Sequence, residues 1–256
     1  LVRRNQDAFS EVRLLPRVLQ PCVTRDLSTL LFVVEYSAPF VVCPMGLGNL
    51  TWPGTDEALM AATAAAGIPY SLSTAGSTSI ERLAALAGKR AWFQLYLTAD
   101  PAVTEGLMRR AEAAGIETLI LTVDSPHPAR RLRDRRNAFG QPVLRNPRAI
   151  LDFALHPRWS LGTLAAGIPG MVNLDSRVGN MEGAHSASVF MASMTRFRLD
   201  WEALDSVRKN WHGKLVVKGV MAPDDARRLV DAGVDAVLVS NHGGRQLGSA
   251  VSTLEV

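Results

Sequence analysis

Cysteine is scarce in this sequence. Only Cys22 and Cys43 occur among its 256 residues, too few for a disulfide framework or a cysteine-based zinc site. Cys43 stands in the apolar run FVVCPM, so we expect a buried and unreactive thiol there. We expect no bound metal, and the lack of cysteine pairs favours a reducing location on the cytoplasmic side.

Long apolar runs and a dominant charge are also absent. No run reaches the ~18 apolar residues that a membrane-spanning helix needs, and the first residues lack the pattern of a signal peptide. The 28 basic and 24 acidic side chains leave a net charge of +4. That excess is too small to indicate a nucleic-acid-binding protein, but it suits an anionic substrate, a phosphate or an anionic membrane surface.

Six short apolar runs predict buried strands. Their residues are almost continuously apolar, which is typical of parallel strands that are covered on both faces. The runs span residues 40–45, 70–74, 92–97, 118–124, 214–220 and 236–241.

Helix-like segments separate several of these runs. Thr55 is a candidate N-cap of the first segment, while Asp100 and Pro101 have the types expected at a helix start. An alternation of strands and helices with short links predicts parallel strands with right-handed crossovers. The candidate helix stops are Gly67, Gly88, Gly115 and Gly233.

Polar residues gather at the C-terminal ends of the predicted strands. In a (β/α)8 barrel these ends meet at one mouth, where the active site forms. An open doubly wound sheet is the alternative, but no G-x-G-x-x-G motif follows the first strand. We therefore predict an α/β fold, a (β/α)8 TIM barrel of which about six β/α units are present. The strand-end residues are Ser73, Gln94, Tyr96, Thr122, Asp124, Lys218, Ser240 and His242.

The region of about 140–199 interrupts this alternation. It contains no clear strand and is far longer than an ordinary connection. We expect it to form an elaborated loop within a single incomplete barrel domain that spans residues 1–256.

The stretch SNHGGRQL places His242 directly after a strand. Gly243 and Gly244 let the backbone approach a ligand closely. A histidine at such a position is a candidate base, and Asp124, at the end of TLILTVD, is a candidate partner for its imidazole. A turn cap before Pro126 is the alternative role for Asp124.

Cations stand near the predicted mouth as well. Lys218 interrupts the apolar run KLVVKGV, and its burial requires an anion, either on a cofactor or on a carboxylate side chain. One arginine of the charged run ARRLRDRR, Arg130 or Arg131, and also Arg245 are candidates for pairing with a substrate carboxylate. The other arginines of that run are expected on a solvated surface.

Five motifs, LST, FQLY, LTVDSP, VKGV and SNHGGRQL, in this order resemble the FMN-dependent 2-hydroxy-acid oxidase and dehydrogenase family. The likeness extends from NQDAF near the start to STLEV at the end. LHPRWSL and the turn from Pro44 to Gly46 are most similar to the mandelate dehydrogenase branch. The resemblance implies FMN-dependent oxidation of a mandelate- or lactate-like (S)-2-hydroxy acid to the 2-oxo acid.

The resemblance also implies a role for individual residues. His242 would be the base that takes the substrate proton, with Asp124 as its partner. Lys218 would stabilise the negative charge of the reduced flavin. The substrate would be bound by Tyr96, Arg131 and Arg245, and the cofactor by Pro44, Met45, Gly46, Ser73, Gln94, Thr122, Lys218 and Ser240.

The family pattern continues on both sides of this sequence. The resemblance therefore implies that the chain is part of a longer enzyme; an inactive truncated barrel fragment, or another flavin- or phosphate-binding barrel enzyme, is the alternative. Gly248 stands where the family usually has aspartate. Ala75 stands where a bulky aromatic is frequent, which favours an aromatic substrate such as mandelate.

The expected partners are a small 2-hydroxy acid, an electron acceptor (oxygen, a quinone or a cytochrome) and, for the full-length enzyme, further copies of itself. The similar branch uses the segment equivalent to 145–198 for membrane attachment. Arg158, Trp159 and nearby leucines suit an interfacial segment. A peripheral position on the inner face of a membrane is therefore expected, with an ordinary surface loop as the alternative.

Overall fold

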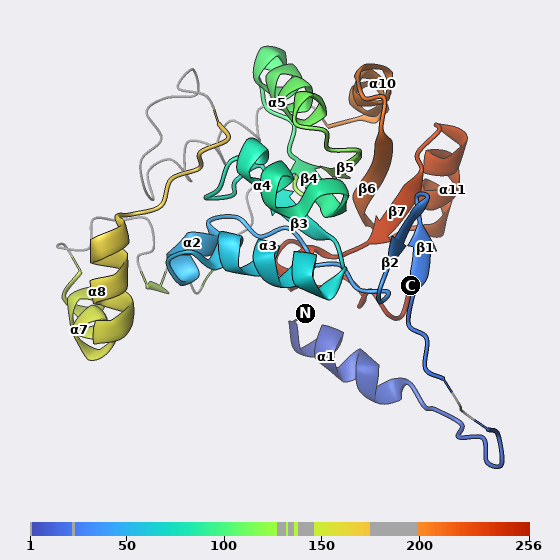
Figure 1. Cartoon of the computed structure of the whole chain (residues 1–256), viewed down its shortest axis with the longest axis horizontal. Coiled ribbons are helices and arrows are strands. Elements are labelled where there is room, and N and C mark those ends of the chain that lie inside the picture. The colour runs from blue at the N-terminus through green and yellow to red at the C-terminus, as the bar shows by residue number, and fades with distance from the viewer. Residues whose placement is uncertain (1, 22–23, 127–131, 133–135, 138–145, 175–198) are drawn as a thin grey trace.

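A five-stranded parallel sheet forms the centre of the molecule (Figure 1). The computed structural model describes residues 2–21, 24–126, 132, 136–137, 146–174 and 199–256. The strand order is β3-β4-β5-β6-β7, so neighbours in the sheet are also successive in the sequence. The strands are β3 (Tyr70–Ser73), β4 (Ala91–Leu95), β5 (Thr118–Thr122), β6 (Lys214–Val220) and β7 (Ala236–Val239).

Helices connect these strands and pack along one face of the sheet. They are α3 (Thr55–Ala66), α4 (Ile80–Ala87), the 3-10 turn η1 (Gly88–Arg90), α5 (Pro101–Ala113), α10 (Trp201–Asn210) and α11 (Pro223–Asp231). The remaining elements are α1 (Val2–Glu11), β1 (Thr29–Leu31), β2 (Val34–Tyr36), α2 (Gly48–Thr51), α7 (Pro147–Leu155), α8 (Pro157–Ala166) and η4 (His242–Gly244). None of the helices in the described part of the chain is both long and apolar enough to cross a membrane.

The predicted helix ends are mostly confirmed. Asp100 caps α5 by accepting a backbone N–H, and Gly67 ends α3 with φ 68°, a left-handed conformation that suits glycine. The prediction for Thr55 is wrong. Gly54, with φ 79°, is the N-cap of α3, and the Thr55 hydroxyl instead donates to the carbonyl of Trp52 in the preceding turn.

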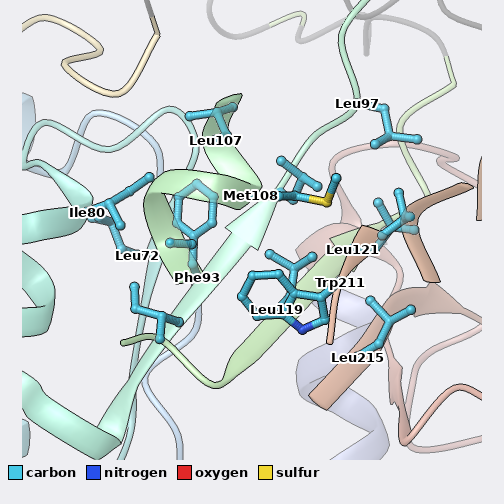
Figure 2. Close-up of a cluster of buried hydrophobic side chains, with 14 of the residues drawn as sticks. Leu72, Ile80, Phe93, Leu97, Leu107, Met108, Leu119, Leu121, Trp211 and Leu215 are labelled. Carbon is cyan, nitrogen blue, oxygen red and sulfur yellow. The ribbon is translucent and has the colours of Figure 1, made fainter. Parts of the chain in front are cut away.

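The helix-facing side of the sheet forms the main core. Phe93, Leu119 and Leu215 of three successive strands are fully buried there against side chains of α4, α5 and α10 (Figure 2). Trp211, which follows α10, fills the same cluster and donates its indole N–H to the Lys214 carbonyl. Every residue of β4 and β5 is buried, which confirms that these strands are covered on both faces.

The other side of the sheet changes from apolar to polar along the strands. Near the N-terminal ends, Trp92, Ile120 and Val216 pack against Tyr36 of the antiparallel β1–β2 hairpin. Because side chains alternate between faces, the residues two positions further on, Gln94, Thr122 and Lys218, point to the same side. The hairpin therefore covers one end of this face, and polar groups occupy the other.

The predicted strand 40–45 is not formed as a strand. Val42 makes one isolated parallel bridge with Tyr70, beside edge strand β3. The ladder does not continue because Pro44 has no N–H to donate. Cys43 is exposed, so the prediction of a buried thiol was wrong: it neighbours Val42, whose side chain is half-buried, and adjacent residues of an extended chain face opposite ways.

The interruption at 140–199 contains two helices where the structure describes it. Asn146 accepts backbone N–H bonds from Arg148 and Ala149 and so caps α7, while Pro157 opens α8. Trp159 attaches this pair to the body by donating to the carbonyls of Leu50 and Thr51. The rest of the segment, 138–145 and 175–198, lies outside the described residues.

Candidate active site

A row of buried polar side chains crosses three neighbouring strands at their C-terminal ends. The Ser73 hydroxyl donates to Gln94 Oε1 at 2.9 Å, and Gln94 Nε2 donates to Thr122 Oγ1 at 2.9 Å. Each residue is at most 3% exposed. Ser73 and Gln94 are register partners in the parallel pairing of β3 with β4, and Thr122 lies two residues beyond Ile120, the register partner of Gln94 on β5. The members of the row present hydrogen-bonding groups to one side of the sheet and not to water.

A second wall comes from two loops next to β3. Leu47 N donates to Ala75 O at 2.8 Å, which ties the turn containing Pro44, Met45 and Gly46 to the loop after β3. A Cβ atom on Gly46 would lie 3.2 Å from the Ala75 Cβ, so the two backbones approach closely.

Asp56 stabilises this region through buried hydrogen bonds, a role that the sequence did not reveal. Its side chain is fully buried and accepts hydrogen bonds from Ser77 N at 2.9 Å and the Tyr70 hydroxyl at 3.3 Å. Burial raises the pKa of Asp56, and burial together with the neighbouring carboxylate raises the pKa of Tyr70. From the sequence, Asp56 was indistinguishable from an ordinary acidic residue in the first turn of a helix.

His242 and Asp124 form the most closely spaced acid–base pair at the strand ends. The distance from His242 Nδ1 to Asp124 Oδ1 is 2.7 Å, and the two side chains are 17% and 10% exposed. This contact fixes the tautomer, since Nδ1 must carry the proton that Asp124 accepts, and Nε2 is then the basic atom. Tyr96 OH lies 3.5 Å from that Nε2 atom.

The chain after β7 is shaped to present His242. The Ser240 hydroxyl accepts from His242 N at 3.0 Å, and Asn241 Oδ1 accepts from Gly244 N at 3.0 Å. His242 itself has φ 56°, and Gly243 and Gly244 follow with φ 61° and 74°. Glycine adopts such left-handed conformations without strain, so the two glycines allow the turn to fold back on itself.

Lys218 lies on the other side of the Asp124 carboxylate. Its Nζ atom is 3.5 Å from Asp124 Oδ2, which is buried and has no hydrogen bond within the described residues. Gly219 makes this approach possible: a Cβ atom there would lie 2.5 Å from the Asp124 Cβ. Gly219 also sits at a register irregularity between β6 and β7 and has φ 107°. Lys218 therefore has the anionic partner that its burial requires.

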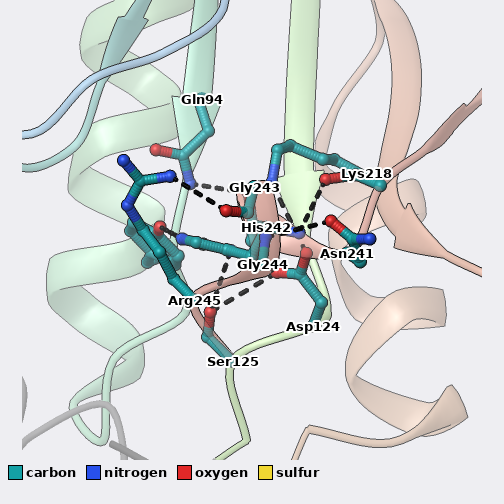
Figure 3. A network of polar contacts seen from close by, with 12 residues as sticks. Gln94, Asp124, Ser125, Lys218, Asn241, His242, Gly243, Gly244 and Arg245 are labelled. Carbon is teal, nitrogen blue, oxygen red and sulfur yellow. Dashed lines mark hydrogen bonds and ion pairs between the residues drawn. The ribbon is translucent and has the colours of Figure 1, made fainter. Parts of the chain in front are cut away.

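Two further side chains border this cluster (Figure 3). Ser125 Oγ lies 3.4 Å from both His242 Nδ1 and Asp124 Oδ1, a position that the sequence did not single out. Arg245 is exposed, and its Nη1 atom donates to Gly243 O at 3.4 Å. Arg131, the other predicted carboxylate-binding arginine, lies outside the described residues.

The strand ends thus combine a base, its carboxylate partner, a buried cation and a row of amide and hydroxyl groups. Within the described ranges no cluster of three or more histidine, cysteine or acidic residues could hold a metal ion. A base of this kind moves a proton, and the buried cation stabilises negative charge that develops near it. The arrangement suits proton removal from a substrate beside a flat, hydrogen-bonding cofactor.

A parallel β/α sheet with this cluster at the carboxyl ends of its strands defines an enzyme of the α/β barrel class. The model of the family described as FMN-dependent dehydrogenase matches residues 1–256. The chain belongs to this FMN-dependent dehydrogenase family, as the sequence motifs predicted.

Comparison with individual proteins agrees with this assignment. The chain is 38% identical to (S)-mandelate dehydrogenase of Pseudomonas putida over 256 residues, which cover 100% of this chain and 64% of that protein. It is 34% identical to L-lactate dehydrogenase of Pseudomonas aeruginosa (strain LESB58) over 253 residues, covering 98% and 66%. The crystal structure of the monotopic membrane protein (S)-mandelate dehydrogenase superposes with a TM-score of 0.91 at 37% identity, covering 100% of this chain and 68% of that one. The predicted barrel fold is confirmed, and the chain spans about two thirds of the length of these relatives.

Proposed function

We propose that the full-length protein containing this chain oxidises an (S)-2-hydroxy acid to the corresponding 2-oxo acid with FMN as its cofactor. The observation that carries the proposal is the 2.7 Å contact between His242 and Asp124 beside the row of Ser73, Gln94 and Thr122. The relatives named as mandelate and lactate dehydrogenases support the substrate class, since both names denote 2-hydroxy acids.

The described residues fit a flavin. The pyrimidine edge of an isoalloxazine carries both N–H and C=O groups, and the row offers an amide and two hydroxyls that donate and accept in turn. The buried Lys218 supplies a cation at the same end of the sheet. Ser240 and the backbone from Pro44 to Gly46 complete the proposed FMN-binding set, with the Met45 side chain 43% exposed beside it. FMN, when bound, accepts the two electrons that leave the substrate.

The chain's own residues then handle the substrate and its proton. His242 Nε2 takes the substrate proton, and Asp124 stabilises the imidazolium that results. Tyr96 OH, 3.5 Å from Nε2, is placed to hydrogen-bond the substrate. Arg245, together with Arg131 as the family resemblance implies, pairs with the substrate carboxylate.

The first experiment is anaerobic mixing of the purified full-length, FMN-loaded protein with (S)-mandelate or (S)-lactate. We expect the visible flavin absorbance to bleach with either acid, and faster with (S)-mandelate, because the small Ala75 side chain leaves room for a phenyl ring. The (R)-acids serve as the stereochemical control. A protein that cannot be loaded with FMN, or whose flavin no 2-hydroxy acid bleaches, would disprove the proposed function.

We also propose that the segment 145–198 makes peripheral contact with the inner face of a membrane. Its helices α7 and α8 project away from the sheet and contain no buried residue (Figure 1). Leu155, Leu161 and Leu164 are 68%, 65% and 80% exposed, and Arg158 stands among them. Apolar side chains with a neighbouring cation suit an anionic interface. The similar (S)-mandelate dehydrogenase structure is described as monotopic.

Flotation with anionic lipid vesicles tests this contact. The full-length protein should float with the vesicles, and Leu155→Asp with Leu164→Asp should reduce the bound fraction about tenfold, since two apolar contacts are lost and two negative charges gained. Val230→Asp on α11, where the valine is 65% exposed, is the matched control and should bind as the parent does. Equal flotation of the double variant and the parent would rule out α7 and α8 as the attachment site.

A further inference from the structure

The N-terminal helix α1 contacts the turn that carries His242. Asn5 and Asn241 exchange a reciprocal pair of hydrogen bonds: Asn5 Nδ2 donates to Asn241 Oδ1 at 3.0 Å, and Asn241 Nδ2 donates to Asn5 Oδ1 at 2.7 Å. Arg4 Nη1 adds a bond to Ala250 O at 2.9 Å. Only Ala8 of α1 is buried, so polar contacts define how the helix sits on this turn.

Asn241 connects that pair to the base. It is 6% exposed and directly precedes His242 in the chain. Its Oδ1 atom also accepts from Gly244 N at 3.0 Å, and its Nδ2 atom also donates to Val251 O at 3.1 Å. Both amide hydrogens and both acceptor directions are therefore used, which leaves the amide a single orientation.

The turn needs this support because its backbone is unfavourable. A non-glycine residue such as His242, with φ 56°, is in a strained backbone conformation that persists only where neighbouring contacts impose it. The Gly244 N–H bond to Asn241 closes the turn around His242. Asn5 is the side chain that fixes which way the Asn241 amide faces, since it supplies one acceptor and one donor to it.

We propose that Asn5 is a positioning residue for the His242 base. The inference rests on the proposed function and deepens it: α1 holds the Asn241 amide, the amide closes the turn, and the turn keeps His242 Nδ1 against Asp124. Loss of the Asn5 amide leaves one donor and one acceptor of Asn241 unpaired and lets the turn relax. The imidazole then spends less time in the orientation that receives the substrate proton.

The test compares Asn5→Leu and Asn5→Ala in the full-length, FMN-loaded protein. Leucine is close to asparagine in shape and both replacements form helix better than asparagine does, so α1 itself is not weakened. We expect the rate of flavin reduction at saturating 2-hydroxy acid to fall about tenfold because the base moves, and KM to rise by a smaller factor, because Arg245 follows the same turn while Tyr96 is untouched. Gln6→Ala, at the exposed neighbouring position of α1, is the control and should keep the parental rate.

A second readout needs no substrate. The chain contains five histidines, so the ring signals of His242 in a carbon–proton NMR spectrum of histidine-labelled protein are identified by their absence in His242→Gln. The groups facing this ring are Asp124, Tyr96, Ser125 and, across Asp124, Lys218, and none of them is altered. The His242 signals should shift in both Asn5 variants and stay unchanged in Gln6→Ala.

Each outcome has a defined meaning. Unshifted His242 signals with parental reduction rates in both Asn5 variants overturn the proposal. A loss of activity in proportion to the loss of folded, FMN-containing protein also overturns it. Failure of both variants to fold overturns it as well, because the role of Asn5 is then purely structural. If no 2-hydroxy acid reduces even the parent protein, the proposed function fails, while the NMR comparison still decides whether Asn5 positions the His242 ring.

Discussion

Replacing His242 with alanine is expected to slow reduction of the bound flavin by a 2-hydroxy acid about a thousandfold, while FMN stays bound. A positioned base contributes typically 10²–10⁴-fold, and His242 is the basic side chain that Asp124 orients at 2.7 Å. FMN binding is retained because the row of Ser73, Gln94 and Thr122 makes no hydrogen bond to His242. Stopped-flow absorbance under anaerobic conditions measures the rate, and the absorbance spectrum before mixing measures the flavin content.

His212→Ala provides the matched control for this loss. His212 also pairs with a carboxylate, Glu112, at 3.1 Å, but its side chain is 83% exposed, and it precedes β6 at the N-terminal end of that strand, opposite the end where the site lies. The control should reduce flavin at the parental rate. A His242→Ala rate within threefold of the parent would show that another group takes the substrate proton.

The sequence predicted the strand ends well because alternation along a strand is a local property. Trp92 and Gln94, or Val216 and Lys218, stand two positions apart and so face the same side of the sheet. On that face, an apolar residue followed two positions later by a polar one therefore predicts where the covered part of the sheet ends and the site begins. A lysine in an apolar strand needs an anion, either on a cofactor or on a carboxylate, and the structure shows the second of these in Asp124.

Features that depend on contacts between distant segments could not be predicted in the same way. Nothing near Asn5 in the sequence indicates that it bonds to a residue 236 positions later. Asp56 was hidden for a similar reason, because its partners Tyr70 and Ser77 belong to a different strand and loop. The run 40–45 looked like a strand by composition, but whether it pairs depends on its place at the sheet edge and on Pro44.

The helices α7 and α8 illustrate a further limit of prediction from the sequence. Several of their apolar residues are left exposed, as for Leu155 and Leu164. The pattern therefore lacks the single buried stripe by which a helix packed on a core is usually recognised. These exposed apolar residues also support the proposed contact of α7 and α8 with a membrane.

Replacing Lys218 with methionine is expected to lower the midpoint potential of the bound FMN by several tens of millivolts. Reduction adds negative charge to the cofactor, and a buried cation about 4 Å away stabilises a unit charge by about 4 kcal/mol at an effective dielectric constant of about 20. For a two-electron couple, about 30 mV corresponds to about 1.4 kcal/mol, so even partial loss of this interaction is measurable. Methionine keeps the length and apolar stem of lysine, and the Ser73, Gln94 and Thr122 row remains to bind FMN.

Lys214→Met is the matched control because Lys214 begins the same strand, β6, at its opposite end. Its Nζ atom pairs with Asp235 at 2.8 Å, and its side chain is 45% exposed, so it lies outside the polar cluster at the strand ends. Each FMN-loaded variant is reduced together with a reference dye. The equilibrium between the dye and the protein gives the midpoint potential of the bound FMN. The control should match the parent, and the Lys218→Met potential should fall below both. If Lys218→Met and Lys214→Met have the same potential as the parent, Lys218 does not face the flavin, and its only partner in the site is Asp124.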